Sequence, residues 1–119
     1  MARFDHLPIY RQAQELMVYV ETVVRGFSRY HKYTIGTRLR EATWQVVTLV
    51  VKANNTPVTE RRPMLVQLRD AVAEVDIALT TAKELKAFAK HEAYVNAARM
   101  AVDLGRQSEG WLKAALQAA

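Results

Sequence analysis

Hydrophobic residues recur at intervals of three and four along almost the whole chain, which is the period of an amphipathic helix. Turn signals divide this pattern into four segments, and we predict helices with approximate bounds of 7–25, 34–53, 60–88 and 90–116. Four long helices with short connections are typical of an antiparallel up-down four-helix bundle. The sequence therefore predicts an all-α fold in which residues 1–119 form a single domain.

Local signals mark several of the predicted helix ends. Pro8 suits a first helical turn, where an N–H has no intrahelical partner, and Gly26 suits the end of the first helix. Residues 54–57, Asn-Asn-Thr-Pro, form the clearest loop in the chain. Thr59 is the predicted cap of the third helix, which places Pro63 in the first turn, where proline is tolerated.

Each predicted helix carries an apolar stripe that we expect to be buried. Residues 44–51 also have high β propensity, but no second strand-like run exists with which they could pair, so we prefer a helix there. The predicted core comprises Ile9, Tyr10, Leu16, Val20, Val23 or Val24, Leu39, Ala42, Trp44, Val46 or Val47, Val50, Val51, Leu65, Leu68, Val72, Val75, Leu79, Ala82, Leu85, Tyr94, Ala97 or Ala98, Met100, Ala101, Leu104, Trp111 and Leu112.

The chain has a formal net charge of +5 at pH 7, and its excess of positive charge lies in the first half. Residues 1–62 contain ten Lys and Arg against five acidic residues, whereas residues 63–119 contain seven of each sign. Residues 25–40 hold five cations and His31 with no acidic residue, interleaved with three aromatic residues. Such a segment favours a polyanionic partner.

We interpret this basic segment as a nucleic-acid-binding surface, because cationic side chains neutralise phosphates and tyrosine rings stack on bases. The candidate residues are Arg25, Arg29, Tyr30, Lys32, Arg38 and Arg40. Arg38 and Arg40 are two positions apart, so they cannot share one face of a helix. The alternative is a solvated loop whose charge has no function.

Residues 104–112, Leu-Gly-Arg-x-x-x-Gly-Trp-Leu, form a second unusual stretch. Glycine inside a helix costs about 1 kcal/mol relative to alanine, so we expect Gly105 and Gly110 to pack closely against another backbone. In one interpretation Trp111 is a core residue that closes the bundle. In the other, Gly105, Arg106, Gly110 and Trp111 form a contact with another subunit or partner.

The sequence offers no constellation of residues for an enzyme. His6, His31 and His91 are far apart and lack the Glu-x-x-His spacing of a di-iron bundle, and the chain has no cysteine. Acidic pairs such as Asp70 and Glu74 are interpreted as a solvated helix face. Neither a phosphate-binding glycine loop nor a nucleophile motif is present. We expect no catalytic residue, no metal site and no cofactor.

The chain also lacks signals for export or membrane insertion. Its N-terminal residues contain no apolar leader segment, and charges interrupt every apolar stretch well before the roughly 18 residues of a membrane span. We expect a cytoplasmic protein that does not enter a membrane.

Two stretches resemble a known family. They are residues 27–40, Phe-Ser-Arg-Tyr-His-Lys-Tyr-Thr-Ile-Gly-Thr-Arg-Leu-Arg, and residues 104–113, Leu-Gly-Arg-Gln-Ser-Glu-Gly-Trp-Leu-Lys. Together they resemble the accessory variability determinant (Avd) proteins of diversity-generating retroelements. The positions that fit the family pattern are Thr34, Ile35, Gly36, Arg38, Gly105, Arg106, Gly110, Trp111 and Leu112.

The resemblance implies a four-helix bundle that assembles into a homopentamer with a positively charged surface. It also implies a non-enzymatic accessory protein that binds reverse transcriptase together with template RNA, DNA or both, and supports mutagenic retrohoming. The alternative is an orphan four-helix bundle of the ribosomal RNA intervening-sequence type, acting as a structural or protein-interaction module. That group usually carries Ser-Ile-Pro-Ala-Asn-Ile-Ala-Glu-Gly where this chain has Val-Thr-Leu-Val-Val-Lys-Ala-Asn-Asn, so the retroelement branch is favoured. A metal-dependent or hydrolytic enzyme is a third, weaker hypothesis.

Overall fold

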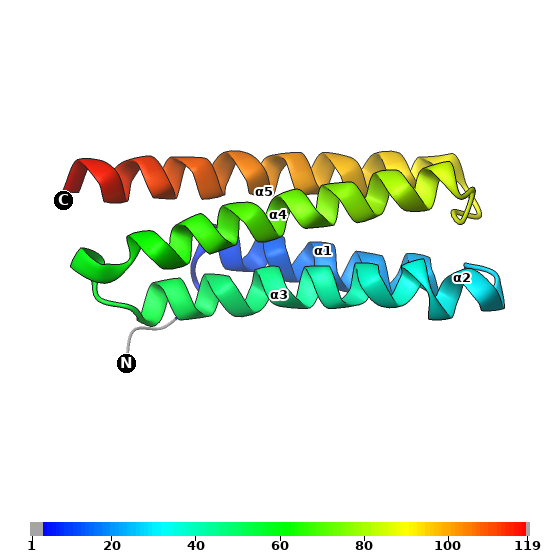
Figure 1. Cartoon of the computed structure of the whole chain (residues 1–119), viewed down its shortest axis with the longest axis horizontal. Coiled ribbons are helices and arrows are strands. Elements are labelled where there is room, and N and C mark those ends of the chain that lie inside the picture. Colours follow the sequence, from blue (N-terminus) through cyan, green and yellow to red (C-terminus); the bar gives the residue numbers. More distant parts are fainter. Residues whose placement is uncertain (1–3, 119) are drawn as a thin grey trace.

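The computed structural model describes residues 4–118 as a bundle of four long helices (Figure 1). These helices are α1 (Pro8–Val24), α3 (Ile35–Asn55), α4 (Arg62–Glu84) and α5 (His91–Ala118). No strand occurs in the described residues, and the stretch with high β propensity lies within α3. The all-α prediction is confirmed.

Two short elements occupy connections between the long helices. The single-turn helix α2 (Arg29–Tyr33) joins α1 to α3, and the 3-10 turn η1 (Val58–Glu60) joins α3 to α4. Helix α2 was not predicted, because one helical turn is too short to show a hydrophobic period. Ser28 begins it, and the Ser28 hydroxyl accepts a hydrogen bond from the His31 backbone N–H at 3.4 Å.

Several predicted helix ends need correction. Pro8 and Pro63 do lie in first turns, but Thr59 belongs to η1 and does not cap α4. Arg61 is the residue before α4, and its guanidinium group donates to the carbonyls of Asn54 and Thr56. The side chain of Arg61 therefore holds the connection that Thr59 was expected to organise.

The end of α1 and the end of α4 are closed in different ways. Gly26 follows α1 as expected, yet the described glycines all lack a positive φ, and the Gly26 N–H simply bonds to the Val23 carbonyl at 3.0 Å. The helix predicted to reach residue 88 stops at Glu84, because Lys86 adopts a left-handed conformation with φ of 58°.

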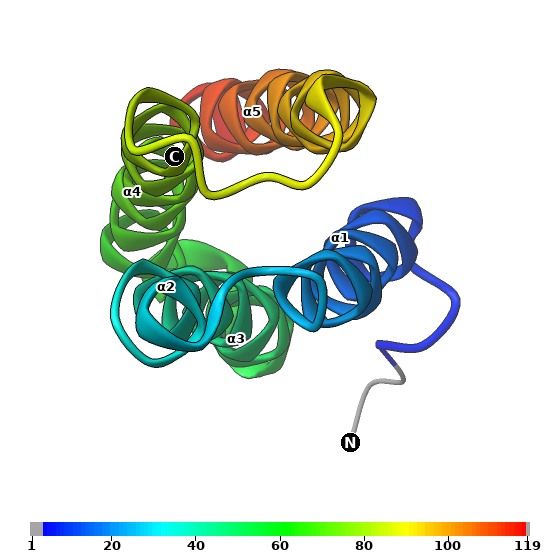
Figure 2. The same ribbon diagram turned by 90° about the vertical axis from the view of Figure 1, so that its right-hand side faces the viewer.

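The long helices surround one hydrophobic core. Helix α1 packs against α3 and α5, and α4 packs against the same two helices, so each long helix has two neighbours (Figure 2). The molecule is elongated, with principal extents of 46 × 24 × 20 Å. The predicted core includes all of the largest fully buried apolar side chains, which are Leu16, Leu39, Leu65, Leu68, Leu79, Leu104, Val20, Val46, Val50 and Val75.

Three predicted core residues are wrong. Val51 is only partly buried and does not belong to the core, to which α3 contributes Leu49 instead. Trp44 is 64% exposed, because its neighbour Thr43 takes the inward position of α3. The Thr43 hydroxyl can be buried there since it donates to the carbonyls of Leu39 and Arg40, both at 3.1 Å. Leu85 is 48% exposed because α4 ends before it. Five further predicted residues, Tyr10, Ala42, Tyr94, Met100 and Trp111, are partly buried against the core.

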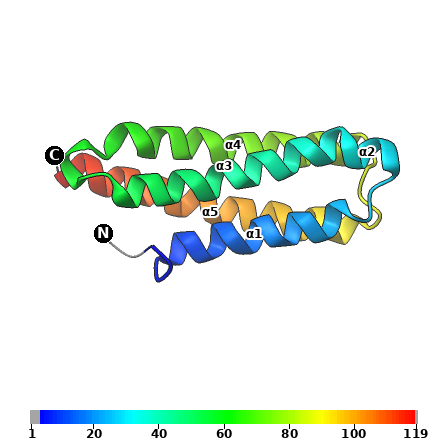
Figure 3. The same cartoon turned by 90° about the horizontal axis from the view of Figure 1, so that it is seen from below.

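The connections fall at opposite ends of the bundle. Helix α2 and the connection between α4 and α5 lie at one end, whereas the connection between α3 and α4 lies at the other end with the C-terminus (Figures 1 and 3). This arrangement brings residues near position 29 to the same end as residues near position 88.

Candidate nucleic-acid interface

The turn between α1 and α2 is anchored by an aromatic contact. Phe27 is only 4% exposed, and its ring packs edge-on against Phe88 with 5.3 Å between ring centroids. Gly26 faces Ala89, whose Cβ lies 3.9 Å from the position that a side chain on the glycine would take. The turn that leads into α2 therefore packs directly on the connection between α4 and α5.

Gly36 explains how α2 folds back onto the start of α3. A Cβ at this buried position would lie 2.8 Å from Val24 Cγ1 and 3.0 Å from the His31 carbonyl oxygen. The Thr34 hydroxyl also donates to the Tyr30 carbonyl at 2.8 Å, which fixes the junction between the two helices. The close approach needs a residue without a side chain, and it packs the start of α3 against Val24 of α1 and against the His31 carbonyl of α2.

Five residues of α2 and the turn before it lie at the end of the bundle that carries the α4–α5 connection. We call them the basic end: Arg25, Arg29, Tyr30, Lys32 and Tyr33. Tyr30 and Tyr33 are 74% and 67% exposed, so their rings are available to a ligand. The three cations form no ion pair with any residue in the range 4–118. Unpaired cations beside exposed rings are the groups that bind a nucleic-acid strand.

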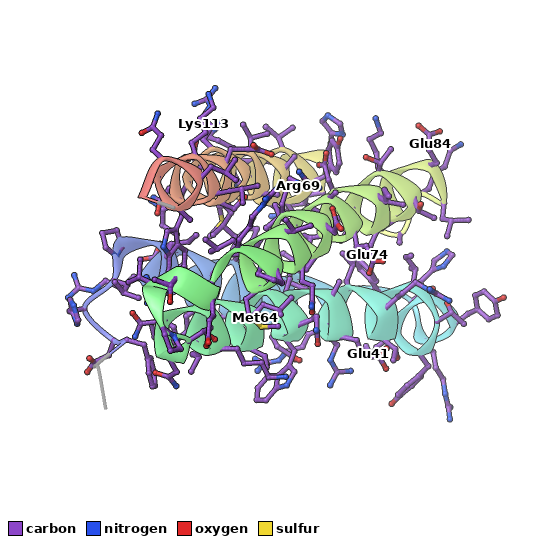
Figure 4. All side chains as sticks on the ribbon, turned by 60° about the vertical axis from the view of Figure 1, so that its left-hand side comes forward. Glu41, Met64, Arg69, Glu74, Glu84 and Lys113 are labelled. Atoms are coloured by element: carbon purple, nitrogen blue, oxygen red, sulfur yellow. The ribbon has the colours of Figure 1, made fainter. Side chains whose placement is uncertain are left out.

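The other two predicted nucleic-acid-binding residues point to different flanks of α3. Arg40 Nε lies 2.7 Å from Glu21 Oε1 of α1, so its charge is partly neutralised. Arg38 lines a groove between α3 and α4 that also contains Glu41 and Glu74 (Figure 4). The structure thus brings four of the six predicted residues together at one end and separates Arg38 and Arg40 from them.

Three lysines that the sequence analysis did not select also lie at this end. Lys83, Lys86 and Lys90 come from the last turn of α4 and from its connection to α5. They escaped notice because the second half of the chain has balanced charge, and Glu84 (Figure 4) and Glu92 offset them locally. One feature of the sequence could have identified Lys86 and Lys90. They lie two residues before and after Phe88, as Arg25 and Arg29 lie two residues before and after Phe27.

The second predicted set of residues is divided between two surfaces. Gly105, Arg106 and Gly110 line a groove of about 570 Å³ between α4 and α5. In Figure 4, Arg69 extends from α4 toward α5, and Lys113 points outward from α5. The remaining groove residues are Val72, Ala73, Asp76, Ala101, Val102, Ser108 and Glu109.

Trp111 faces away from this groove. It lines a smaller hollow beside Leu7, Pro8 and Ile9, and the Arg61 guanidinium carbon lies 5.7 Å from its ring centroid. Trp111 is therefore a partly buried residue that closes one end of the core, which agrees with the first of the two interpretations of this stretch.

The expected packing of the two α5 glycines against another backbone is wrong within this chain. A Cβ at Gly105 would meet only Val72 Cγ1, at an ordinary 3.9 Å, and a Cβ at Gly110 would meet no atom within 4 Å. Gly110 is exposed in the middle of a long helix. Contacts inside the described chain do not explain this glycine.

Within residues 4–118, no three His, Cys, Asp or Glu side chains lie together in a group that could hold a metal ion. No helix in the same range is long and apolar enough to cross a membrane.

Comparison with known proteins adds no family assignment. No protein-family model matches the chain, and no curated protein matches it significantly. The function must therefore be inferred from the residues and their geometry.

Proposed function

We propose that this chain binds single-stranded nucleic acid through the basic end, as a non-enzymatic accessory protein of a reverse transcriptase. The observation that carries the proposal is the juxtaposition of Arg25, Arg29 and Lys32, all without ion pairs in the described chain, with the exposed rings of Tyr30 and Tyr33. Cations neutralise the phosphates of a strand, and each base has a face that can stack on tyrosine.

Single strands are preferred over duplexes on chemical grounds. Bases in a duplex are stacked on each other, so tyrosine rings on a protein surface cannot reach their faces. The five residues of the basic end also lie on one short helix and the turn before it, within a bundle cross-section of 24 × 20 Å. This area suits a short segment of flexible strand.

We also infer an antiparallel up-down course for the four long helices, as the sequence predicts. Such a course places the first and third of the long-helix connections at the same end. It accounts for the convergence of the α1–α2 turn with the α4–α5 connection.

Salt dependence tests the binding mode. We expect the chain to bind a single-stranded RNA of about 12 nucleotides, within the usual range of site sizes, as measured by fluorescence anisotropy. If the three cations of the basic end each contact a phosphate, log Kd against log salt concentration should change with a slope of magnitude about 2. Absence of binding at low salt, or binding that is independent of salt, contradicts the proposal.

The reverse transcriptase partner is supported by the resemblance of residues 27–40 and 104–113 to Avd proteins. We expect the chain to copurify with the reverse transcriptase encoded beside it, next to a pair of repeats. A gene placed inside a ribosomal RNA gene, with no reverse transcriptase beside it, would instead favour the orphan-bundle hypothesis.

Homopentamer formation is part of the same proposal. Gly110 leaves an exposed stretch of α5 backbone beside Gly105 and Arg106, and a backbone without side chains allows a second subunit to approach closely. Light scattering should give a mass near five chains, where one chain has a mass of 13.5 kDa. A monomer at micromolar concentrations contradicts this assembly.

A protein-interaction role is the second candidate, and the exposure of Trp44 favours it. Trp44 is 64% exposed on α3, in a shallow groove with Glu21, Arg40 and Gln45. Tryptophan and arginine are enriched at the centres of protein interfaces. This surface is separate from the basic end, so a protein partner and a nucleic acid can be bound together.

A further inference from the structure

The connection between α4 and α5 contains a strained lysine. Lys86 has φ of 58°, and it is the one non-glycine residue with a positive φ in the described chain. The Ala87 N–H bonds to the Ala82 carbonyl and the Lys86 N–H to the Lys83 carbonyl, each at 2.9 Å. These bonds form the helix-closing motif in which the left-handed position is usually glycine, because a Cβ there is strained.

This lysine lies at the same end of the bundle as the basic end. The turn that carries Arg25 and Arg29 packs against the connection through Phe27 on Phe88, with ring centroids 5.3 Å apart. Lys86 and Lys90 flank Phe88 in the sequence as Arg25 and Arg29 flank Phe27. The contact between Phe27 and Phe88 therefore has cations beside it on both segments, the α1–α2 turn and the α4–α5 connection.

The lysines differ in how free their charges are. Lys83 Nζ lies 3.8 Å from Glu84 Oε1 and 5.0 Å from the Tyr94 ring centroid, so it is already engaged. Lys86 and Lys90 are exposed and form no ion pair within residues 4–118. Two free cations are thus added to the three of the basic end.

We infer that the α4–α5 connection is a second wall of the nucleic-acid site, in which Lys86 and Lys90 bind phosphates of the strand that contacts the basic end. Lysine at position 86 is kept for its charge, at the expense of backbone strain that glycine would relieve. The inference rests on the proposed function, because it concerns the same ligand. It adds a segment more than 50 residues away in the sequence.

Substitutions at Lys86 distinguish the effect of its charge on RNA affinity from the effect of its backbone strain on thermal stability. Lys86→Gly relieves the left-handed strain and removes one cation, so thermal unfolding should shift to higher temperature while affinity for the 12-nucleotide RNA falls roughly threefold. The log–log salt slope should lose about 0.7, the contribution of one phosphate on a single strand. Lys86→Arg keeps the charge and should keep the affinity, and Lys86→Gly with Lys90→Gln should lose roughly tenfold.

Two control variants distinguish failure of the inference about Lys86 and Lys90 from failure of the proposed function. Lys52→Gln removes one exposed cation from the last turn of α3, at the opposite end of the bundle, and should leave affinity unchanged, whereas Arg29→Glu should weaken binding. If Arg29→Glu weakens binding but the Lys86 and Lys90 variants do not, the second wall is wrong and the proposed function stands. If wild-type protein binds no RNA, both fail. A lower melting temperature for Lys86→Gly contradicts the strain at this position.

Discussion

Two of the three helical glycines, Gly36 and Gly110, have opposite surroundings. At Gly36 a Cβ would collide with Val24 and with the His31 carbonyl, whereas at Gly110 it would enter open space. The same residue type therefore has two different explanations. Gly36 is required by the fold, because it lets α2 approach α3, and Gly110 is not required by any contact inside the described chain.

Alanine substitutions should separate the two glycines. Gly36→Ala is expected to destabilise the fold by about 1–3 kcal/mol, because overpacking must displace Val24 or α2. Gly110→Ala is expected to stabilise the monomer by up to about 1 kcal/mol, because alanine is the better helix former. Urea unfolding followed by circular dichroism measures both.

The outcome for Gly110 also depends on assembly. If Gly110 contacts another subunit, Gly110→Ala should lower stability, and the loss should depend on protein concentration. Similar destabilisation by both substitutions in a monomeric protein would contradict the distinction between them.

At some positions the sequence pattern does not show which of two adjacent residues is buried. Helical periodicity identifies the buried leucines other than Leu49, because each follows its neighbours at three or four positions. It cannot decide between Thr43 and Trp44, which are adjacent in sequence, and hydrophobicity favours the wrong one. The decisive fact is that the Thr43 hydroxyl bonds to backbone carbonyls of its own helix. That compensation is visible only in three dimensions.

At the scale of elements, the two connections at the basic end stabilise each other. Helices α1, α3, α4 and α5 follow from their hydrophobic period and were predictable. Helix α2 and the early end of α4 were not, because each depends on a contact distant in sequence or on the conformation of one residue, Lys86. The pairing of Phe27 with Phe88 joins elements that the sequence leaves unrelated.

A double-mutant cycle should detect this pairing. Phe27→Leu and Phe88→Leu keep apolar bulk but remove the edge-on ring contact, which contributes about 0.5–1.5 kcal/mol beyond buried area. The two substitutions together should therefore be less destabilising than the sum of the single effects by about that amount. The cycle is measured as free energies of unfolding, from urea titration, of the wild type, the two single variants and the double variant.

The control cycle pairs Phe27→Leu with Leu65→Ala, in the core near the other end of α4. Those effects should add to within about 0.5 kcal/mol, as expected for separate sites. Additivity of the Phe27 and Phe88 substitutions would contradict the coupling of the two connections.

For the whole molecule, charge is distributed unevenly along a long axis of 46 Å. The net charge of +5 reveals that the protein is basic, but it does not reveal where the charge is concentrated. The sequence identified Arg25, Arg29 and Lys32, and it included Arg38 and Arg40 because they are close in sequence. In the fold Arg40 pairs with Glu21, and Arg38 lines the groove between α3 and α4. Lys86 and Lys90 come to the same end as Arg25 and Arg29, because the helices bring distant segments together.

The most direct test of the central claim is to exchange charge at one end of the bundle and then at the other. Arg25→Glu with Arg29→Glu should reduce affinity for the 12-nucleotide RNA by on the order of tenfold or more at about 0.1 M salt. Lys52→Glu with Arg62→Glu changes the net charge equally, but these residues lie toward the opposite end, beyond the Debye length of about 10 Å, so affinity should remain close to wild type. Equal losses in the two variants would show that binding depends on net charge alone, and would contradict a site at the basic end.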